Sequence, residues 1–309
     1  MTAEALLGRA GELPIGRGVV ADAAGALLRN RPALVGMTIL GVLLATAILA
    51  DVIAPYPPQK ILFNEGAEPR DAPCIHLLGC PVDQAEHVMG IDSNGRDEFS
   101  RVIHGARVSL FIGFFAVGFA IVLGAGLGAV AGYAGGWADN GIMRFMDVLL
   151  AFPSLLLAIA LVTLLGPGLN NALIAIGIVQ IPIYARIIRS SVLSVKEMDF
   201  VTAERALGAS PVRILVRRIL PNSLTPLIVQ GTLGIATAVL DAAALSFIGL
   251  GAQPPTAEWG AMIGIERNIA FRTAPFLIFF PGAALALTVL GFNLLGDGLR
   301  DALDPRLNR

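Results

Sequence analysis

Charged residues are scarce in this sequence. Only 15% of its 309 residues are Asp, Glu, Lys or Arg, whereas soluble globular proteins carry about 25%. Hydrophobic residues make up 55% of the chain, and the mean hydropathy is +0.75. The formal net charge is −1, so no basic surface for nucleic acid is expected. The composition therefore indicates an integral membrane protein surrounded by lipid.

Residues that commonly carry out chemistry are also few. His76, His87 and His104 are the three histidines, and no nucleophile–base–acid set can be grouped around them. The sequence contains no G-x-x-x-x-G-K-[ST] phosphate-binding loop. Cys74 and Cys80 flank His76, but this spacing matches no common zinc site. We therefore expect no catalytic site, no metal and no cofactor in this chain.

Six apolar segments are long enough to cross a membrane as helices, which requires about 20 residues. They cover residues 34–54, 108–131, 142–165, 172–188, 224–250 and 275–295. The first segment is too long, and starts too far into the chain, to be a cleaved signal peptide. The sequence therefore predicts an all-α membrane protein with six transmembrane helices.

The distribution of Lys and Arg predicts how these helices are oriented. With a cytoplasmic N-terminus, fifteen of the 22 basic residues fall on the cytoplasmic side, as the positive-inside rule requires. Both termini are then cytoplasmic. The predicted divisions are a cytoplasmic tail (1–33), a first transmembrane helix (34–54), an extracytoplasmic segment (55–105), a five-helix core (106–299) that includes a cytoplasmic loop (190–222), and a cytoplasmic C-terminal tail (300–309).

The cytoplasmic loop is predicted to contain two short helices between Asp199 and Asn222. In the first, Phe200, Ala203 and Leu207 form an apolar stripe. Gly208 then suits a left-handed helix end.

The second short helix is predicted to start at Ser210 and Pro211 and to end at Pro221. Its apolar stripe consists of Val212, Leu215, Val216 and Ile219, and its basic residues outside the stripe are Arg213, Arg217 and Arg218. This pattern fits either an interfacial helix whose arginines meet lipid phosphates or a docking surface for a soluble partner.

Several polar residues interrupt the predicted spans. Asp241 is the single acid deep in the fifth span, and a charge there is costly and is commonly functional. It could line a wet translocation path or hydrogen bond to a neighbouring helix, and the second role costs less. Ser154 beside Pro153 and Gln180 near Pro182 are further candidates for the path, because proline kinks suit a gated bundle as well as a static one.

Two patterns in the second and third spans are interpreted as structural. Gly124, Gly128 and Gly132 recur every fourth residue, which allows another helix to approach closely. Arg144 and Asp147 are spaced to form an ion pair on one helix face.

Four segments resemble signatures of the permease subunits of ABC importers in the dipeptide/oligopeptide/nickel group. The first, between Thr202 and Pro221, resembles the EAA loop. Ala203, Gly208, Leu220 and Pro221 keep its pattern, while Thr202 stands for the usual Glu, Glu204 for an Ala and Arg218 for an Ile.

The other three signatures follow the same order as in that family. Residues 87–97 match H-x-x-G-T-D-x-x-G-R-D except for Ile91, residues 245–260 match L-S-F-L-G-L-G-x-x-P-P-x-x-x-W-G except for Ile248, and residues 293–306 match N-x-x-G-D-x-L-R-D-x-L-D-P-R. Between residues 87 and 110 the residues alone also fit an interfacial helix with snorkelling arginines.

The resemblance implies a type I importer permease, a MetI-like fold in the inner or plasma membrane. Such a subunit pairs with a homologous permease and two cytoplasmic ATPases that bind ATP and Mg, and it receives substrate from an extracytoplasmic binding protein. The ATPases would contact Thr202, Ala203, Glu204, Gly208, Arg213, Arg217, Leu220 and Pro221.

Peptide is the substrate that this resemblance favours. Nickel, glutathione and other small solutes are carried by related permeases and stay open as alternatives. A secondary transporter is less favoured, because it would need more buried acids and an inverted repeat.

The pair Cys74 and Cys80 lies in the predicted extracytoplasmic segment, where disulfides persist. The alternative is two free thiols. We expect an oxidised pair, because the two residues can close a short loop. Labelling of intact cells with a membrane-impermeant thiol reagent should therefore leave both residues unmodified unless a reductant is added. Efficient labelling at both positions without reductant would show that they are free.

Overall fold

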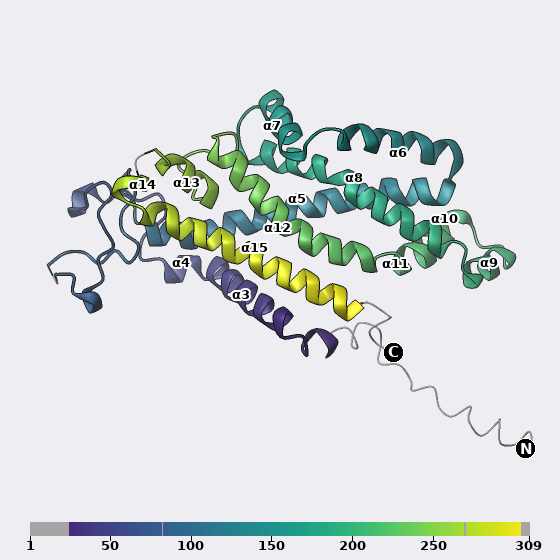
Figure 1. The fold of residues 1–309 in the computed structure, drawn as a ribbon, viewed down its shortest axis with the longest axis horizontal. Coiled ribbons are helices and arrows are strands. Elements are labelled where there is room, and N and C mark those ends of the chain that lie inside the picture. The colour runs from purple at the N-terminus through teal and green to yellow at the C-terminus, as the bar shows by residue number, and fades with distance from the viewer. Residues whose placement is uncertain (1–24, 82, 269, 304–309) are drawn as a thin grey trace, which may run out of the picture.

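The computed structural model describes residues 25–81, 83–268 and 270–303 (Figure 1). Most of the predicted tail 1–33, and residues 304–309 of the predicted tail 300–309, lie outside this range. The chain is all-helical in the described part apart from turns, loops and isolated β-bridges. Its α-helices are α3 (Arg31–Ile48), α4 (Ala50–Ile53), α5 (Glu98–Ala134), α6 (Gly136–Leu150), α7 (Ser154–Leu165), α8 (Leu169–Val195), α9 (Asp199–Ala206), α10 (Pro211–Ile214), α11 (Leu220–Asn222), α12 (Thr225–Phe247), α13 (Trp259–Glu266), α14 (Ala270–Thr273) and α15 (Phe276–Leu303).

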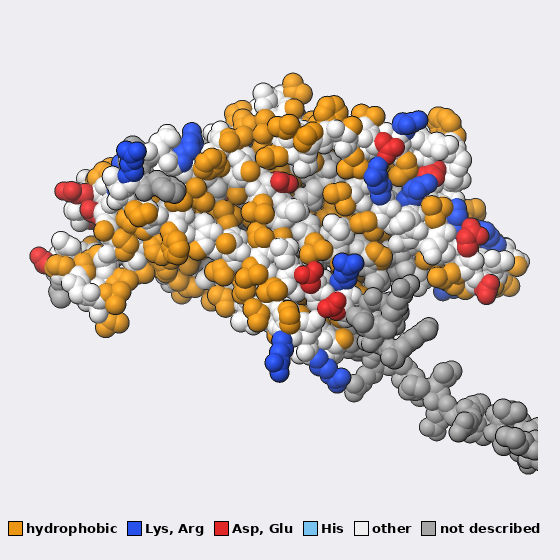
Figure 2. All heavy atoms as spheres, in the orientation of Figure 1, with side chains coloured by type: hydrophobic (Ala, Val, Ile, Leu, Met, Phe, Trp, Pro, Cys, Tyr) orange, Lys and Arg blue, Asp and Glu red, His pale blue; other side chains and the backbone are white. Residues whose placement is uncertain are grey.

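Five of the described helices are long and apolar enough to cross a membrane. They are α3, α5, α8, α12 and α15, which lie side by side along the long axis of the molecule (Figure 1). A space-filling view of the same face shows hydrophobic side chains over its middle and most charged ones toward its ends (Figure 2). This distribution is the one that lipid requires of a bundle.

The predicted third span is not one straight helix. It consists of α6 and α7, which meet at an angle of 92°. Pro153 lies at the N-cap of α7, and proline cannot continue an α-helix because it lacks the N–H group and clashes with the preceding turn. The predicted kink at Pro153 is therefore confirmed and is larger than an ordinary kink. Pro182, in contrast, lies inside the continuous helix α8.

The centre of the bundle is the contact between α5 and α8. Gly124, Gly128 and Gly132 lie on the α5 face that meets α8, and all three are buried. A Cβ atom built on Gly124 would lie 2.7 Å from the carbonyl oxygen of Ile181. The glycine repeat therefore works as predicted, because it lets two backbones approach without intervening side chains.

The first helix is attached to the last one in the same way. A Cβ atom on Gly36 of α3 would lie 2.8 Å from the carbonyl oxygen of Gly291 on α15. The rest of α3 is mostly uncovered, and Val42 and Ile48 are among its exposed side chains. This helix therefore lies at the edge of the bundle.

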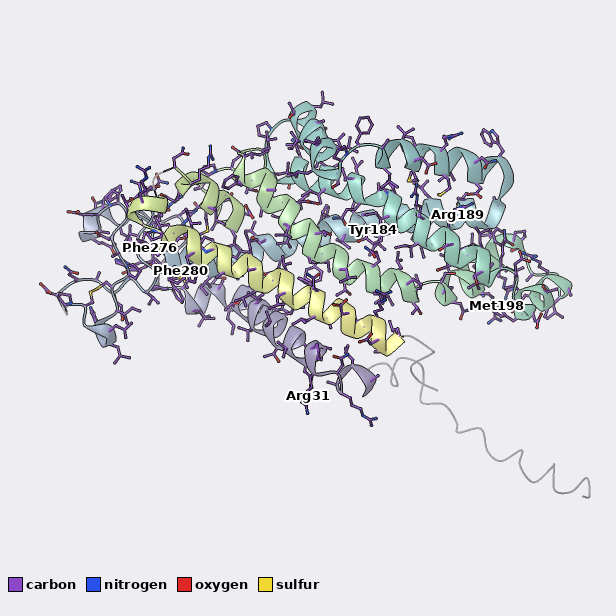
Figure 3. The ribbon with its side chains drawn as sticks, in the orientation of Figure 1. Arg31, Tyr184, Arg189, Met198, Phe276 and Phe280 are labelled. Carbon is purple, nitrogen blue, oxygen red and sulfur yellow. A yellow bond between two sulfur atoms is a disulfide. The ribbon has the colours of Figure 1, made fainter. Side chains whose placement is uncertain are left out.

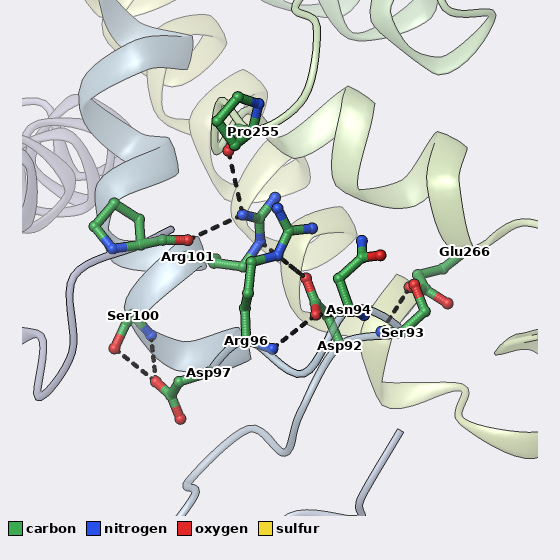
Figure 4. Close-up of polar contacts among 10 residues, drawn as sticks. Asp92, Ser93, Asn94, Arg96, Asp97, Ser100, Arg101, Pro255 and Glu266 are labelled. Carbon is green, nitrogen blue, oxygen red and sulfur yellow. Dashed lines mark hydrogen bonds and ion pairs between the residues drawn. The ribbon is translucent and has the colours of Figure 1, made fainter. Parts of the chain in front are cut away.

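The end of the bundle at which α5 begins is closed by a buried charge cluster (Figure 4). Asp92 accepts hydrogen bonds from the backbone N–H groups of Asn94 and Arg96 at 2.8 and 2.9 Å, and from the Arg96 guanidinium at 2.7 Å. Arg101 donates to the carbonyl oxygens of Pro58 and Pro255. The alternative of snorkelling arginines is wrong for Arg96 and Arg101, which are buried.

Carboxylates in and around this cluster fix the neighbouring helices. Asp97 caps α5 by accepting from the N–H of Ser100 at 2.8 Å. Glu266 of α13 accepts from the backbone N–H of Ser93 and pairs with Arg70 at 3.3 Å. Glu258 caps α13 through the N–H groups of Gly260 and Ala261, and burial raises the pKa of its carboxyl group. The segment before α5 is thus tied to α13.

The same end of the molecule carries the disulfide between Cys74 and Cys80, whose Cα atoms are 5.4 Å apart. This bond closes a loop around the 3₁₀ turn η2 (His76–Leu78). Leu77 and Leu78 are almost fully exposed at its tip.

The glycine contact between α5 and α8 yields a direct test. A Cβ atom at Gly128 would overlap the carbonyl oxygen of Ala185, whereas a Cβ atom at Gly126 would meet nothing within 4 Å. We expect Gly128→Ala to destabilise the protein by about 1–3 kcal/mol through overpacking, and therefore to lower its melting temperature in detergent.

Gly126→Ala is the matched control for this test. It has the same gain in helix propensity, about 1 kcal/mol, but no clash, so it should be neutral or stabilising. Equal melting temperatures of the two variants would contradict the close approach of α5 and α8.

Candidate functional site

The segment between α8 and α12 forms a compact pair of short helices at one end of the bundle (Figure 1). α9 ends at Ala206, and Gly208 follows with φ +81°. This left-handed conformation is one that glycine adopts without steric cost. Pro211 is the first residue of α10. The prediction of a helix, a glycine turn and a second helix is therefore confirmed.

The end of the second helix differs from the prediction. Pro221 does not end it. After α10 the chain forms a π-helical turn, η3 (Leu215–Ile219), and continues into α11. The N–H of Leu220 bonds to the carbonyl oxygen of Leu215, five residues earlier. This wider turn accommodates Pro221, which has no N–H group to donate and would crowd the preceding turn of a regular α-helix.

The predicted helix start at Ser210 is only partly right. Ser210 occupies the N-cap position of α10 with extended backbone angles, but its side chain makes no capping hydrogen bond. Its carbonyl oxygen accepts from the N–H of Ile214 at 3.0 Å. The turn is therefore set by Gly208 and Pro211 and not by a serine cap.

The first predicted apolar stripe points outward in this chain, whereas the second is divided between exposed and buried residues. Phe200 is 38% exposed, Leu207 86% and Val212 72%. The short helices are held against the bundle by Val201, Ile214 and, from the second stripe, Ile219, which are buried. An uncovered apolar face of this kind indicates a contact with another protein or with lipid.

Charged residues surround this apolar face. Glu204 of α9 pairs with Arg218 of η3 at 2.5 Å and so links the two short helices. Phe200, Leu207 and Arg218 line a hollow of about 480 Å³ between them. Arg213 and Arg217 lie beside Glu204 and Arg218 around a second hollow. Figure 2 shows this end of the molecule as a mixture of basic, acidic and hydrophobic side chains.

We call this region the coupling surface, defined by Phe200, Ala203, Glu204, Leu207, Val212, Arg213, Val216, Arg217 and Arg218. The structure places the predicted residues together on or beside it. Thr202, Ala203, Gly208, Arg213, Arg217 and Pro221 are exposed, and Glu204 and Leu220 are partly buried.

The coupling surface is joined directly to two membrane helices. α8 ends at Val195, and Met198 is already the N-cap of α9; Figure 3 shows Met198 at the tip of the molecule and Tyr184 near its middle. On the other side, Ser223 and Leu224 alone separate α11 from α12. A displacement of the coupling surface therefore reaches α8 and α12 over very few residues.

Basic side chains of α8 attach it to α6 and to the end of α5. Arg189 donates two hydrogen bonds to Asp139, at 2.5 and 2.6 Å. Asp147 pairs with Arg186 at 2.5 Å, so the predicted pair of Asp147 with Arg144 is wrong. Lys196 donates to the carbonyl oxygen of Gly132 at 3.0 Å. The sequence spacing could suggest pairs within one helix but not these pairs between helices.

The candidate path residues do not form one cluster. Gln180 is buried next to Tyr184, and both side chains lie against Gly234 of α12. Ser154 is exposed at the start of α7, and Asp241 is half-buried on α12. Within the described residues, no hydrogen bond or ion pair reaches Asp241, so the expected hydrogen bond to a neighbouring helix is not found there. Tyr184 was not predicted as a candidate, because the sequence does not show that its hydroxyl group lies against Gly234 of another helix.

Comparison with known proteins gives a consistent family. Residues 124–309 match the family model described as binding-protein-dependent transport system inner membrane component. Residues 20–71 match the model of the N-terminal transmembrane domain of oligopeptide transport permease C.

Two similar relatives are named as peptide permeases. The dipeptide transport system permease protein DppC of Alkalihalophilus pseudofirmus is 49% identical over 91% of this chain and 88% of its own length. The di/tripeptide permease DppC of Pseudomonas aeruginosa is 46% identical over 90% of this chain and 89% of its own. The glutathione transport system permease protein GsiD of Escherichia coli is 45% identical over 90% of this chain and 88% of its own length.

A solved structure of similar fold is the inward-facing MetNI methionine ABC transporter. It superposes with a TM-score of 0.55 over 67% of this chain and 97% of that one, at 19% identity. The likeness supports the fold alone. The family match and the relatives show that this chain belongs to the binding-protein-dependent transport system inner membrane components and is a membrane permease subunit of an ABC importer.

Proposed function

We propose that this permease carries short peptides across the membrane together with a homologous permease, and that two cytoplasmic ATPases drive it through the coupling surface. The observation that carries the proposal is the coupling surface itself. Its apolar side chains are exposed in this chain, and it is joined without a long linker to α8 and α12.

The coupling surface suits a protein partner better than lipid. Glu204 and Arg218 are paired with each other, so an acid lies among the arginines, whereas a helix that only meets lipid phosphate keeps its polar face basic. Leu207 and Val212 supply uncovered apolar area close to the exposed side chains of Arg213 and Arg217. Apolar residues bordered by arginine are typical of a protein interface.

ATP and Mg would be bound by the partner ATPases, since this sequence has no phosphate-binding loop. Closure of the ATPases would push on α9 and α10. The push would reach α8 and α12, which pack against each other where Tyr184 meets Gly234. The ion pairs of Arg186 and Arg189 would then move α6 with α8.

Peptide is the substrate class best supported by the relatives. The names of the similar proteins refer to dipeptides, di/tripeptides and glutathione, and glutathione is itself a modified tripeptide. A secondary transporter is disfavoured by the family match. We infer that a binding protein delivers the peptide at the end of the bundle that carries the disulfide loop and the buried charge cluster.

Charge reversal tests the role of the coupling surface. We expect Arg213→Glu with Arg217→Glu to weaken association with the ATPases by at least about tenfold, because each interfacial charge pair contributes on the order of 1 kcal/mol or more. The measurement is the affinity of purified ATPase for the permease pair in nanodiscs.

The matched control reverses two arginines on the same side of the molecule but away from the coupling surface. Arg29 and Arg31 are exposed near the start of α3, and Figure 3 shows Arg31 far from Met198. Arg29→Glu with Arg31→Glu should leave the affinity unchanged. If both double variants bind ATPase like the original protein, the arginines of the coupling surface contact lipid instead.

Gly208 tests the geometry of the turn. A Cβ atom there would meet nothing within 4 Å, but φ is +81°, and this conformation costs about 1–2 kcal/mol for a residue with a side chain. Gly208→Val should therefore weaken ATPase binding by misplacing α9 relative to α10, and Gly208→Asn should do so less because Asn tolerates this region. Gly141→Ala in α6, with open space and helical backbone, is the control. Full binding by the Val variant would contradict a fixed turn.

A further inference from the structure

One face of α12 carries three polar side chains that this chain leaves at least partly uncovered. Thr237 is exposed, and Gln230 and Asp241 are half-exposed. Their spacing is i, i+7 and i+11, which places all three on one side of an α-helix. Leu240 and Ile248 border this side and are also exposed. We call Gln230, Thr237 and Asp241 the polar stripe of α12.

The polar stripe runs along the border of the helix face that packs against the rest of the chain, where Thr237 is exposed and Gln230 and Asp241 are half-exposed. Gly231, Gly234, Ala238 and Leu245 lie on the packed face and are buried. Tyr184 and Gln180 meet Gly234, which lies three residues before Thr237. The other helices of this chain thus leave the side chains of the stripe at least partly uncovered.

Asp241 has no compensating charge in the described part of the chain. It takes part in none of the ion pairs there, and α12 contains no Lys or Arg. A carboxylate that faces lipid is strongly disfavoured. The side chain must therefore face a wet cavity or a partner.

We propose that Asp241 binds the α-ammonium group of the transported peptide in the cavity shared with the homologous permease. This proposal rests on the proposed function. Asp241 is the single charge on α12, and its sign fits the one cationic group that every unmodified peptide carries. The specificity is then for a free amino end, independent of the peptide side chains.

The spacing of the stripe fits a short peptide. Asp241 and Thr237 are one turn apart, about 6 Å along the helix axis, and two extended residues span about 7 Å. The hydroxyl group of Thr237 donates to the carbonyl oxygen of Gly234, so its oxygen is free to accept a peptide N–H group. Gln230 lies about 16 Å from Asp241 along the axis, within reach of the far end of a longer peptide.

The first experiment determines what the stripe faces. The sequence has two cysteines, and they are bonded to each other, so a single introduced cysteine is the reactive thiol of this chain, and labelling is read on this chain after the subunits are separated. In the assembled transporter, Asp241→Cys and Thr237→Cys should react with a water-soluble cationic thiol reagent, and a dipeptide should slow the reaction. Val42→Cys, on the uncovered side of α3, is the lipid-facing control and should stay unlabelled.

The second experiment measures specificity. Uptake of alanyl-alanine and of N-acetyl-alanyl-alanine is compared in proteoliposomes that contain the complete transporter with one binding protein. The preference of the binding protein is the same for every permease variant, so it cancels when the uptake ratios are compared. Asp241→Asn should reduce the preference for the free amino end by about tenfold, the effect of losing a hydrogen bond to a charged group. Asp241→Glu should largely restore it.

Each outcome decides between the inference and its alternatives. An unchanged ratio in Asp241→Asn, with normal uptake by the original protein, overturns the role of Asp241 and leaves the proposed function intact. Loss of permease pairing in Asp241→Asn, measured by size-exclusion chromatography, shows that Asp241 pairs with the partner permease and also overturns it. Failure of the original protein to take up either peptide refutes the proposed function itself.

Discussion

The rest of the structure depends on the direct backbone contact between α5 and α8. Lipid offers helices little hydrophobic reason to associate, so close packing must hold them together. Gly124, Gly128 and Gly132 make this possible, because a Cβ atom at any of them would crowd α8 within 3 Å. Once α8 is fixed along this line, its basic residues reach α6 and the end of α5, and its last turn leads into α9. The contact between α5 and α8 in the middle of the bundle thus determines where the coupling surface lies at its end.

Much of this arrangement follows from local sequence patterns. Long apolar runs predicted the helices, the glycine repeat predicted a close contact, and Gly208 followed by Pro211 predicted two short helices with a turn between them. These features depend on residues within about one turn of each other, so they are encoded locally. The partners of Asp139 and Asp147 are not, because Arg189 and Arg186 come from another helix. A sequence gives the spacing within a helix but not the rotation of two helices about their axes.

The sequence pattern left open whether the apolar stripes of the coupling surface meet lipid or a soluble partner. The structure adds that the second stripe is divided between two sides of its helix. In this chain Leu207 and Val212 face outward, while Val201, Ile214 and Ile219 hold the segment in place. The π-helical turn is a further difference from the predicted second helix. It rotates α11 relative to α10 and accommodates Pro221 within a continuous helical path. A segment that must contact two bodies needs two apolar faces, and the pattern alone cannot say which face meets which body.

The same reasoning applies within the membrane. The packed face of α12 is complete, since small buried residues fit against α5, α8 and α13. Its polar stripe is not, since Asp241 has no counter-ion in the described residues and would be costly against lipid. If this chain makes one wall of a path, as we propose, the opposite wall would come from another subunit. This incompleteness has a consequence for transport. Because only Ser223 and Leu224 separate α11 from α12, movement of the coupling surface would also move the helix that carries Asp241. The site that would hold a peptide and the surface that would receive mechanical work are then connected through α11 and α12.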